Sequence, residues 1–163
     1  MSDSNWKVFD LDELLERLLR VISGAIPAQS AYILTMHPET KLPVIRSHWS
    51  LNNKSEFDRP YSTTMVNEVI RTRTAVLTVD AQEEYGDADS VMAGDIRAIM
   101  CVPLCGRTYQ VVGAIYVDTG EDGRMFKGDD LKLLTAIGRV TGVAVENAVL
   151  HQNAVEQERL AAI

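Results

Sequence analysis

The sequence predicts an α+β domain built on one antiparallel sheet, and three features predict this class. Apolar residues recur at helical spacing near both ends of the chain, β-branched runs of strand length lie between them, and two pairs of these runs are joined by connections of hairpin length. Helices that flank hairpin-connected strands pack on a sheet rather than alternate with parallel strands. With 46% hydrophobic residues, the 163-residue chain can bury a core without disulfides or a structural metal.

The first helix is predicted over residues 11–22. Asp10 and Glu13 have the spacing of a capping box, and leucines then recur every three or four residues. Gly24 and Pro27 end the pattern.

Four apolar runs predict two β-hairpins. Runs 31–36 and 42–49 flank a turn-like His-Pro-Glu-Thr segment, and runs 99–104 and 110–118 flank a short connection that contains a glycine. Pro103 has no N–H to donate to a neighbouring strand, so we expect it at a sheet edge, a bulge or a strand end.

The segment between the two hairpins predicts a helix, a strand and a loop. Thr63 or Thr64 can cap a short helix whose apolar residues share one side. Residues 75–79 are mostly β-branched and predict a strand. Residues 80–95 are rich in acidic side chains and contain no basic one, so they predict an acidic loop.

The last helix is predicted from about Lys127 to the end of the chain, with Asp129 and Asp130 in its first turn, where the helix dipole favours acids. Its side chains form two stripes, of which one can cover the sheet while the other contacts a partner. The first stripe comprises Leu134, Ile137, Thr141, Ala144 and Ala148, and the second comprises Leu133, Val140, Val143, Asn147, Leu150 and Ala154. The final residues are strong helix formers without a glycine or proline, so we expect a further segment to follow them.

The charge and the cysteines indicate the setting. A formal net charge of -7 with scattered Lys and Arg disfavours nucleic acid and anionic membrane surfaces as partners. No apolar stretch is expected to approach the roughly 18 to 20 residues of a membrane helix. Cys101 and Cys105 are too far apart along a strand for an unstrained disulfide, which favours a cytoplasmic location.

In order and spacing, three stretches of the chain resemble GAF domains, which are signalling input modules typical of bacteria. The stretches are residues 65–72, residues 96–104, and residues 112–118 together with Phe126, Asp130, Leu131, Leu134 and residues 146–148. The resemblance spans residues 11–150, which leaves residues 1–10 as an N-terminal extension and residues 151–163 as a helical extension toward an output domain.

The resemblance implies a six-stranded antiparallel sheet with the terminal helices on one face and a ligand pocket on the other, closed by shorter helices and loops. The walls of that pocket are then the acidic loop and the strands around Met100 and Tyr116. The candidate lining residues, which could also simply fill the core, are Tyr85, Val91, Met92, Ile96, Met100 and Tyr116.

Cyclic nucleotides are not the expected ligand. GAF domains that bind them carry an Asn-Lys pair at the end of the last central strand, then a Phe and an Asp-Glu pair. Residues 117–120 supply no Asn-Lys, and although Phe126 and Asp130 match, Leu131 stands in the place of the Glu.

The other known GAF cofactors are not expected either, so the cofactor stays unknown. No helix holds the cysteine that would attach a bilin, and His37, His48 and His151 lack the spacing of haem or metal ligands. Asp87 and Asp89 lack the Gly and Glu of a calcium loop, so no metal site is predicted.

The alternative to a regulatory domain is a stand-alone redox enzyme. Some GAF proteins reduce free methionine sulfoxide with cysteines in the loop before the Val-Pro strand, but residues 80–95 contain none. Cys101 and Cys105 lie in the strand itself, where a cysteine is usually a small buried hydrophobe. No phosphate loop, Ser-His-Asp set or zinc motif is present.

The sequence therefore predicts a non-catalytic sensor or relay domain that forms a homodimer and controls an output domain in the same chain, such as a cyclase, phosphatase, kinase or transcription activator. An unidentified small molecule can be a further partner. The candidate dimer residues lie on the first and last helices: Leu15, Leu18, Val140, Val143, Asn147 and Leu150.

Overall fold

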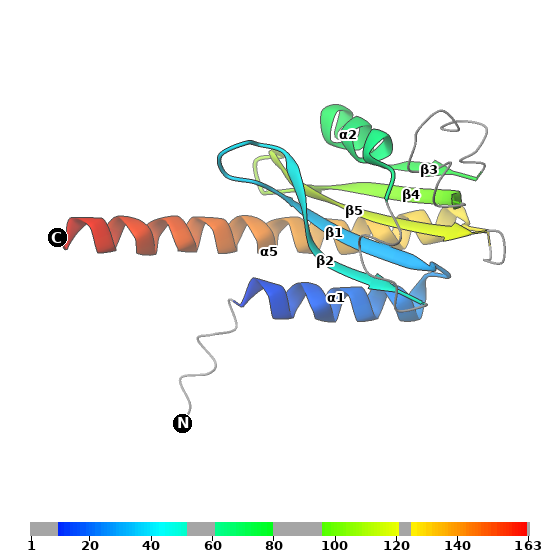
Figure 1. Ribbon diagram of the computed structural model, residues 1–163, viewed down its shortest axis with the longest axis horizontal. Helices are drawn as coiled ribbons and strands as arrows, with labels where there is room; N and C mark the ends of the chain where they lie inside the picture. The colour runs from blue at the N-terminus through cyan, green and yellow to red at the C-terminus, as the bar shows by residue number, and fades with distance from the viewer. Residues whose placement is uncertain (1–9, 52–60, 80–95, 121–124, 163) are drawn as a thin grey trace, which may run out of the picture.

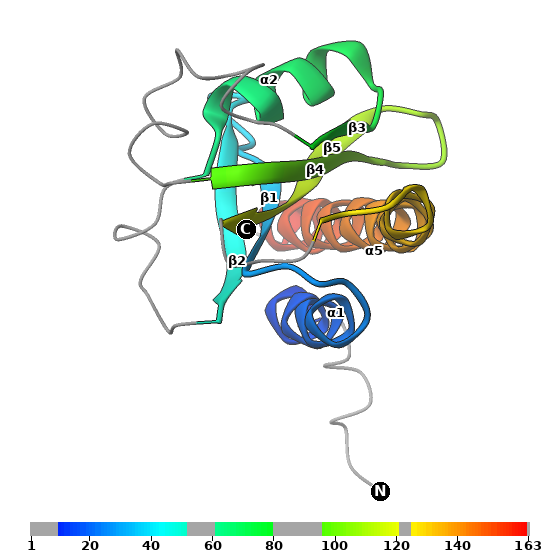
Figure 2. The same cartoon turned by 90° about the vertical axis from the view of Figure 1, so that its right-hand side faces the viewer.

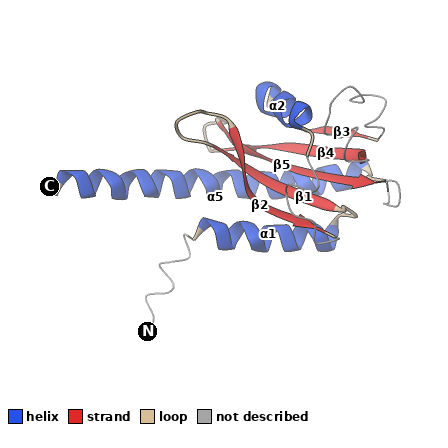
Figure 3. Ribbon diagram, in the orientation of Figure 1, coloured by secondary structure: helices blue, strands red, loops and turns tan. Residues whose placement is uncertain are grey.

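The computed structural model describes residues 10–51, 61–79, 96–120 and 125–162. Within these residues, five strands form one antiparallel sheet in the order β2-β1-β5-β4-β3, and three helices pack on it (Figures 1 and 3). The predicted α+β class is confirmed. The sixth strand that the family resemblance implies is not among the described residues.

Both predicted hairpins are present. The first pairs β1 (Ser30–Met36) with β2 (Pro43–Ser50), and the second pairs β4 (Ile96–Cys105) with β5 (Val111–Gly120). The short β3 (Val76–Thr78) joins the edge of β4. The two hairpins meet along β1 and β5, which are antiparallel neighbours and so form the centre of the sheet.

Pro103 lies where a residue without an N–H is tolerated. β3 pairs with β4 only at Ile99, Met100 and Cys101, so Pro103 is beyond the reach of that neighbour. A shift in the pairing of β4 with β5 follows directly, between Leu104 and Cys105. The expectation of a bulge or strand end is confirmed.

The long helices α1 (Leu11–Ala25) and α5 (Gly128–Ala161) lie side by side on one face of the sheet, and α2 (Thr63–Thr72) lies on the other (Figure 2). In Figure 1 the two long helices run in opposite directions. Because side chains alternate along a strand, the sheet has two cores. One packs against α1 and α5 and includes Leu15, while the other packs against α2 and includes Met65.

The short helix α2 begins one or two residues earlier than the sequence indicated. Its cap is Ser62, whose hydroxyl accepts a hydrogen bond from the backbone N–H of Met65 at 3.3 Å. Thr63 and Thr64 are instead the first helical residues and are exposed, so the prediction that one of them caps the helix is wrong. Ser62 is fully buried, and its hydroxyl satisfies a helix N–H that would otherwise lack a partner.

The helix α5 touches the end of β4 backbone to backbone. A Cβ at Gly142 would overlap the carbonyl oxygen of Cys105 and lie 2.7 Å from its nitrogen, so no side chain fits there. One turn earlier, a Cβ at Gly138 would come within 3.1 Å of the Val102 side chain. One turn later, the Glu146 carboxylate accepts a hydrogen bond from the backbone N–H of Arg107 in the β4–β5 turn, at 3.1 Å.

Beyond this contact α5 leaves the body of the domain. Every residue from 149 to 162 is exposed, and Figure 1 shows the C-terminal part of the helix extending past the sheet. By length and composition α5 could cross a membrane, so the expectation that no segment approaches that length is wrong. The apolar character of this helix has a different use in the fold, because Leu134, Thr141 and Val145 are buried against the sheet and α1.

We expect Gly142→Ala to lower the free energy of unfolding by about 1 to 3 kcal/mol, because the added methyl group has no space against the Cys105 backbone. Gly24→Ala is the matched control: Gly24 lies in a helix, but a Cβ there meets nothing within 4 Å. That control should raise the stability by about 0.5 to 1 kcal/mol, the usual gain from replacing glycine in a helix. Urea unfolding measures both changes, and equal effects of the two variants would contradict the close contact.

Candidate functional site

Buried polar side chains gather on the α2 face of the sheet, at one end of its strands. Across all five strands, the pairing aligns Ser50, Ser30, Asp118, Ile99 and Thr78. Four of these five residues are polar, and none is more than 6% exposed. We call the serines, Thr78 and Asp118 the polar row.

Three tyrosines lie beside the polar row on the same face. Tyr32 and Tyr116 are direct partners on β1 and β5, and Tyr61 reaches them from the segment that precedes α2. Their ring centroids are 5.5 to 5.9 Å apart, at tilted and edge-on angles that favour aromatic contact. His48 on β2 stacks on Tyr32 at 6.0 Å. We call the three tyrosines the aromatic cluster.

The polar row and the aromatic cluster share an electrostatic contact. Burial raises the pKa of Tyr116 well above its ordinary value of 10.0, and the negative charge of Asp118 raises it further. The Tyr116 hydroxyl is close enough to Asp118 to sense its charge. Both groups are fully buried, so this phenol stays neutral beside the carboxylate.

Backbone contacts fix the position of Asp118. Its carbonyl oxygen accepts a hydrogen bond from the N–H of Gln29 at 2.9 Å. The Gln29 side chain in turn accepts a hydrogen bond from the N–H of Gly120 at 2.7 Å. The end of β5 is thereby held against the start of β1, and the face on which Asp118 lies is determined by the strand pairing.

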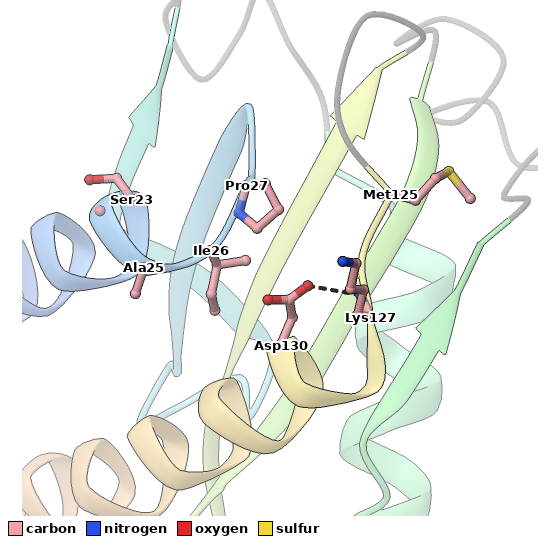
Figure 4. A pocket seen from close by; sticks show the side chains of 8 residues that line it. Ser23, Ala25, Ile26, Pro27, Met125, Lys127 and Asp130 are labelled. Atoms are coloured by element: carbon pink, nitrogen blue, oxygen red, sulfur yellow. Dashed lines mark hydrogen bonds between the residues drawn. The ribbon is translucent and has the colours of Figure 1, made fainter.

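The described residues also form an open hollow of about 810 Å³ on the opposite side of the sheet. It lies between the C-terminal end of α1 and the start of α5, and its polar side chains include Lys127 and Asp130 (Figure 4). The Asp130 carboxylate already accepts a hydrogen bond from the Lys127 backbone at 2.8 Å. None of the residues predicted to line the ligand pocket lies in this hollow.

Residues 10–146 match the GAF domain family. This chain belongs to that family. GAF domains are signalling sensor modules, and they are regulatory rather than catalytic as a rule. The predicted resemblance to GAF domains is therefore confirmed.

Known structures agree with the fold of this GAF domain. The GAF3 domain of a Synechocystis sp. PCC6803 protein, solved in its photoproduct state, superposes with a TM-score of 0.72 at 16% identity and covers 88% of this chain and 98% of that one. A GAF domain/HD domain protein from Geobacter sulfurreducens superposes with a TM-score of 0.68 at 14% identity, over 88% and 97% of the two chains. At these identities the likeness concerns the fold alone.

A curated relative is an enzyme, the dual 3′,5′-cyclic-AMP and -GMP phosphodiesterase 11A of Takifugu rubripes. It is 27% identical over 99 residues, which cover 56% of this chain. The match spans only 11% of the length of that phosphodiesterase.

The structure separates the residues predicted to line the GAF pocket. Tyr116 lies on the α2 face as expected, but Met100 packs in the core beneath α1 and α5, so its assignment to the pocket is wrong. The reason is strand alternation: Cys101, one residue later, is the β4 partner of Tyr116. The described residues do not include Tyr85, Val91 and Met92, and the side chain of Ile96 is likewise outside them.

Sequence reasoning missed Tyr32, Ser30 and Ser50, which complete the site. The signal that would have found them is the alternation along β1, where Ser30 and Tyr32 share a face opposite Ala31 and Ile33. That signal becomes useful only with the pairing of β1 to β5, which a sequence pattern does not supply.

The two cysteines of the GAF domain lie in different environments. Cys101 is fully buried among apolar residues of the α2 face, as predicted for a small hydrophobe. Cys105 is half-buried at the end of β4, where burial raises the pKa of its thiol and the nearby Arg73 charge lowers it. Both are free thiols.

The predicted dimer residues differ in their exposure to solvent. Leu15 is fully buried in the core of its own chain, where a partner cannot reach it, so its assignment to the interface is wrong. Val140 and Leu150 are 67% and 57% exposed on α5. Leu18, Val143 and Asn147 are half-buried.

The stability of this GAF domain should fall as the pH rises above about 9, because burial holds the pKa of the Cys101 thiol far above its ordinary value of 9.0. The unfolded chain loses this proton and the folded domain keeps it, so alkali favours unfolding by about 1.4 kcal/mol per pH unit. Urea unfolding between about pH 8 and pH 10 measures the slope. Cys101→Ala should reduce the slope of the unfolding free energy against pH by the amount that one proton contributes, and Cys105→Ala should reduce it less. Equal slopes for Cys101→Ala and the wild type would contradict this account.

Proposed function

We propose that this GAF domain is a non-catalytic sensor or relay module that forms a homodimer and controls an output domain joined to α5. The observation that supports it most is the double role of α5. The helix packs against the strand that borders the polar and aromatic face, and its exposed side carries an apolar stripe available to a partner.

The path from the site to α5 is short. Cys101 contacts the α2-side cluster beside Tyr116, and Val102, the next residue of β4, faces α5 at Gly138. Protein interiors are close-packed and transmit strain. Because Gly142 leaves no gap against Cys105, a displacement of β4 has to move α5 or separate the two elements.

The exposed stripe of α5 has the spacing of a coiled-coil seam. Leu133, Val140 and Leu150 are exposed, and Val143 and Asn147 between them are half-buried. These five positions follow the a and d places of a heptad, where apolar residues insert into a facing helix and a buried Asn fixes the register. Two α5 helices in parallel would cover the stripe and bring both C-terminal ends to the same side.

The proposed output follows from two supports. Residues 149–162 of α5 project from the body of the domain, so they can connect it to a further domain. The phosphodiesterase relative is an enzyme, and the segment that matches this chain makes up only 11% of its length. A regulatory segment attached to a larger enzyme is the arrangement that this short match suggests. We propose a cytoplasmic, bacterial setting for the present chain.

The rival redox function finds little support in the described residues. A catalytic cysteine needs a thiolate, and burial of Cys101 stabilises its thiol instead. Cys105 is more accessible, but the backbone of α5 at Gly142 lies directly against the backbone of Cys105. We therefore propose that the domain itself carries out no chemistry.

Replacing Val140 and Leu150 together with Glu should convert a dimer into a folded monomer, because the like charges would face one another across the seam. Val149→Glu with Val155→Glu is the matched control, since these two residues are exposed on the same helix but lie off the heptad seam. That control should remain dimeric. Sedimentation equilibrium gives the mass and circular dichroism checks the fold.

Two results would contradict the proposed dimer. One is a wild-type chain that sediments as a monomer at tens of micromolar. The other is a control pair that dissociates as readily as the seam pair, which would show that any added charge on α5 acts in the same way.

A further inference from the structure

The hollow between the end of α1 and the start of α5 has the volume of a small-molecule site, about 810 Å³. Residues 23–27 line one side of it, and Met125, Lys127 and Asp130 line the other. Figure 4 shows the Asp130 carboxylate pointing from α5 toward the α1 side of the hollow. A molecule bound here would therefore contact the ends of both long helices.

Three backbone carbonyl groups at the C-terminal end of α1 lack their helical hydrogen-bond partners: those of Ser23, Gly24 and Ala25. The residue four positions after Ser23 is Pro27, which has no N–H. The N–H of Ala28 bonds to the carbonyl of Ile26 at 2.7 Å, so it is not available to Gly24. The N–H of Gln29 bonds to the carbonyl of Asp118 at 2.9 Å, so it is not available to Ala25. The described residues therefore supply no donor to this end of the helix, which borders the hollow.

The charges around the hollow favour a cation. The C-terminal end of a helix carries a partial negative charge, and the last turn of α1 contains no basic residue to offset it. Across the hollow, one oxygen of the Asp130 carboxylate accepts a hydrogen bond from the Lys127 backbone at 2.8 Å, which leaves the other oxygen for a ligand. The Lys127 residue is exposed, so solvent screens the charge of its ammonium group.

A primary ammonium group fits these acceptors better than a metal ion does. It is a compact charge with three N–H donors, and the end of α1 offers three carbonyl oxygens. A calcium ion needs six or more oxygen ligands, and the described residues hold no group of three His, Cys, Asp or Glu side chains that could bind a metal. Pro27 and Met125 supply apolar surface beside the acceptors.

We propose that the hollow binds a small organic cation, an alkyl compound with a primary ammonium group. The ammonium bonds to the carbonyl oxygens at the end of α1 and lies beside Asp130, while the alkyl part packs against Pro27 and Met125. The ligand thereby joins the end of α1 to the start of α5. The inference goes beyond the proposed relay function, because binding in this hollow requires neither a dimer nor an output domain.

Four probes of similar size test the proposed class: butylammonium, tetramethylammonium, butanol and butyrate. Each is titrated into the full chain at constant ionic strength and followed by the NMR signals of the backbone N–H groups. Butylammonium should shift the signals of residues 24–26 and 128–130 at millimolar concentrations. Tetramethylammonium has the charge but no N–H donor, and butanol and butyrate lack the positive charge, so these three should shift the signals far less.

Three variants assign the binding to the hollow. Asp130→Asn retains an oxygen for the Lys127 N–H but loses the charge, so it should weaken butylammonium binding several-fold. Asp129→Asn, at the exposed neighbouring acid, is the matched control and should weaken it much less. Lys127→Ala removes a like charge from the rim and should tighten binding, which keeps the test decisive even if Asp130→Asn disturbs the start of α5.

The inference is overturned if butylammonium shifts no signal of these residues at millimolar concentrations, or if tetramethylammonium shifts them equally. It is also overturned if Asp130→Asn and Asp129→Asn act alike in the folded protein, or if Lys127→Ala weakens binding. Potassium chloride that reproduces the shifts by itself would show a simple inorganic cation site and would equally contradict the proposal. None of these results bears on the dimer, which the seam variants of α5 test separately.

Discussion

The backbone contact between α5 and the end of β4 is the constraint on which the rest of the structure depends. Gly142 and Gly138 let the helix lie directly on the strand, and Glu146 then bonds to the turn that follows it. Three successive turns of α5 are thereby fixed to one strand. A helix fixed in this way cannot shift independently of the sheet. The sheet therefore also sets the position and orientation of the exposed residues 149–162.

The opposite face of the sheet has a different composition. The α1 and α5 face is closed by large apolar side chains, whereas the α2 face combines tyrosines, buried serines and a buried carboxylate. The pairing of β1 with β5 holds the polar row in place.

Most of the architecture could be predicted from local sequence patterns, because helix periodicity and strand-length apolar runs depend on near neighbours. Both hairpins, both long helices and the position of Pro103 are examples. The errors about the site and the dimer arose where a long-range contact decides the answer. Met100 was assigned to the wrong face because a run of apolar residues shows no alternation, and Leu15 was assigned to a dimer because a periodic stripe does not reveal which surface covers it. The polar row escaped notice for the same reason, since its members come from four strands and meet only through the pairing.

The central claim is that the two faces of β4 are energetically coupled, so that an event at the aromatic face reaches α5. A double-mutant cycle of unfolding free energies between Cys101→Ala and Gly142→Ala tests it most directly, because the two residues contact opposite faces of the same strand. The account predicts an interaction energy of about 0.5 kcal/mol or more, while a reference cycle between Cys101→Ala and Gly24→Ala on α1 should be additive within about 0.3 kcal/mol. Additivity in both cycles would contradict the coupling.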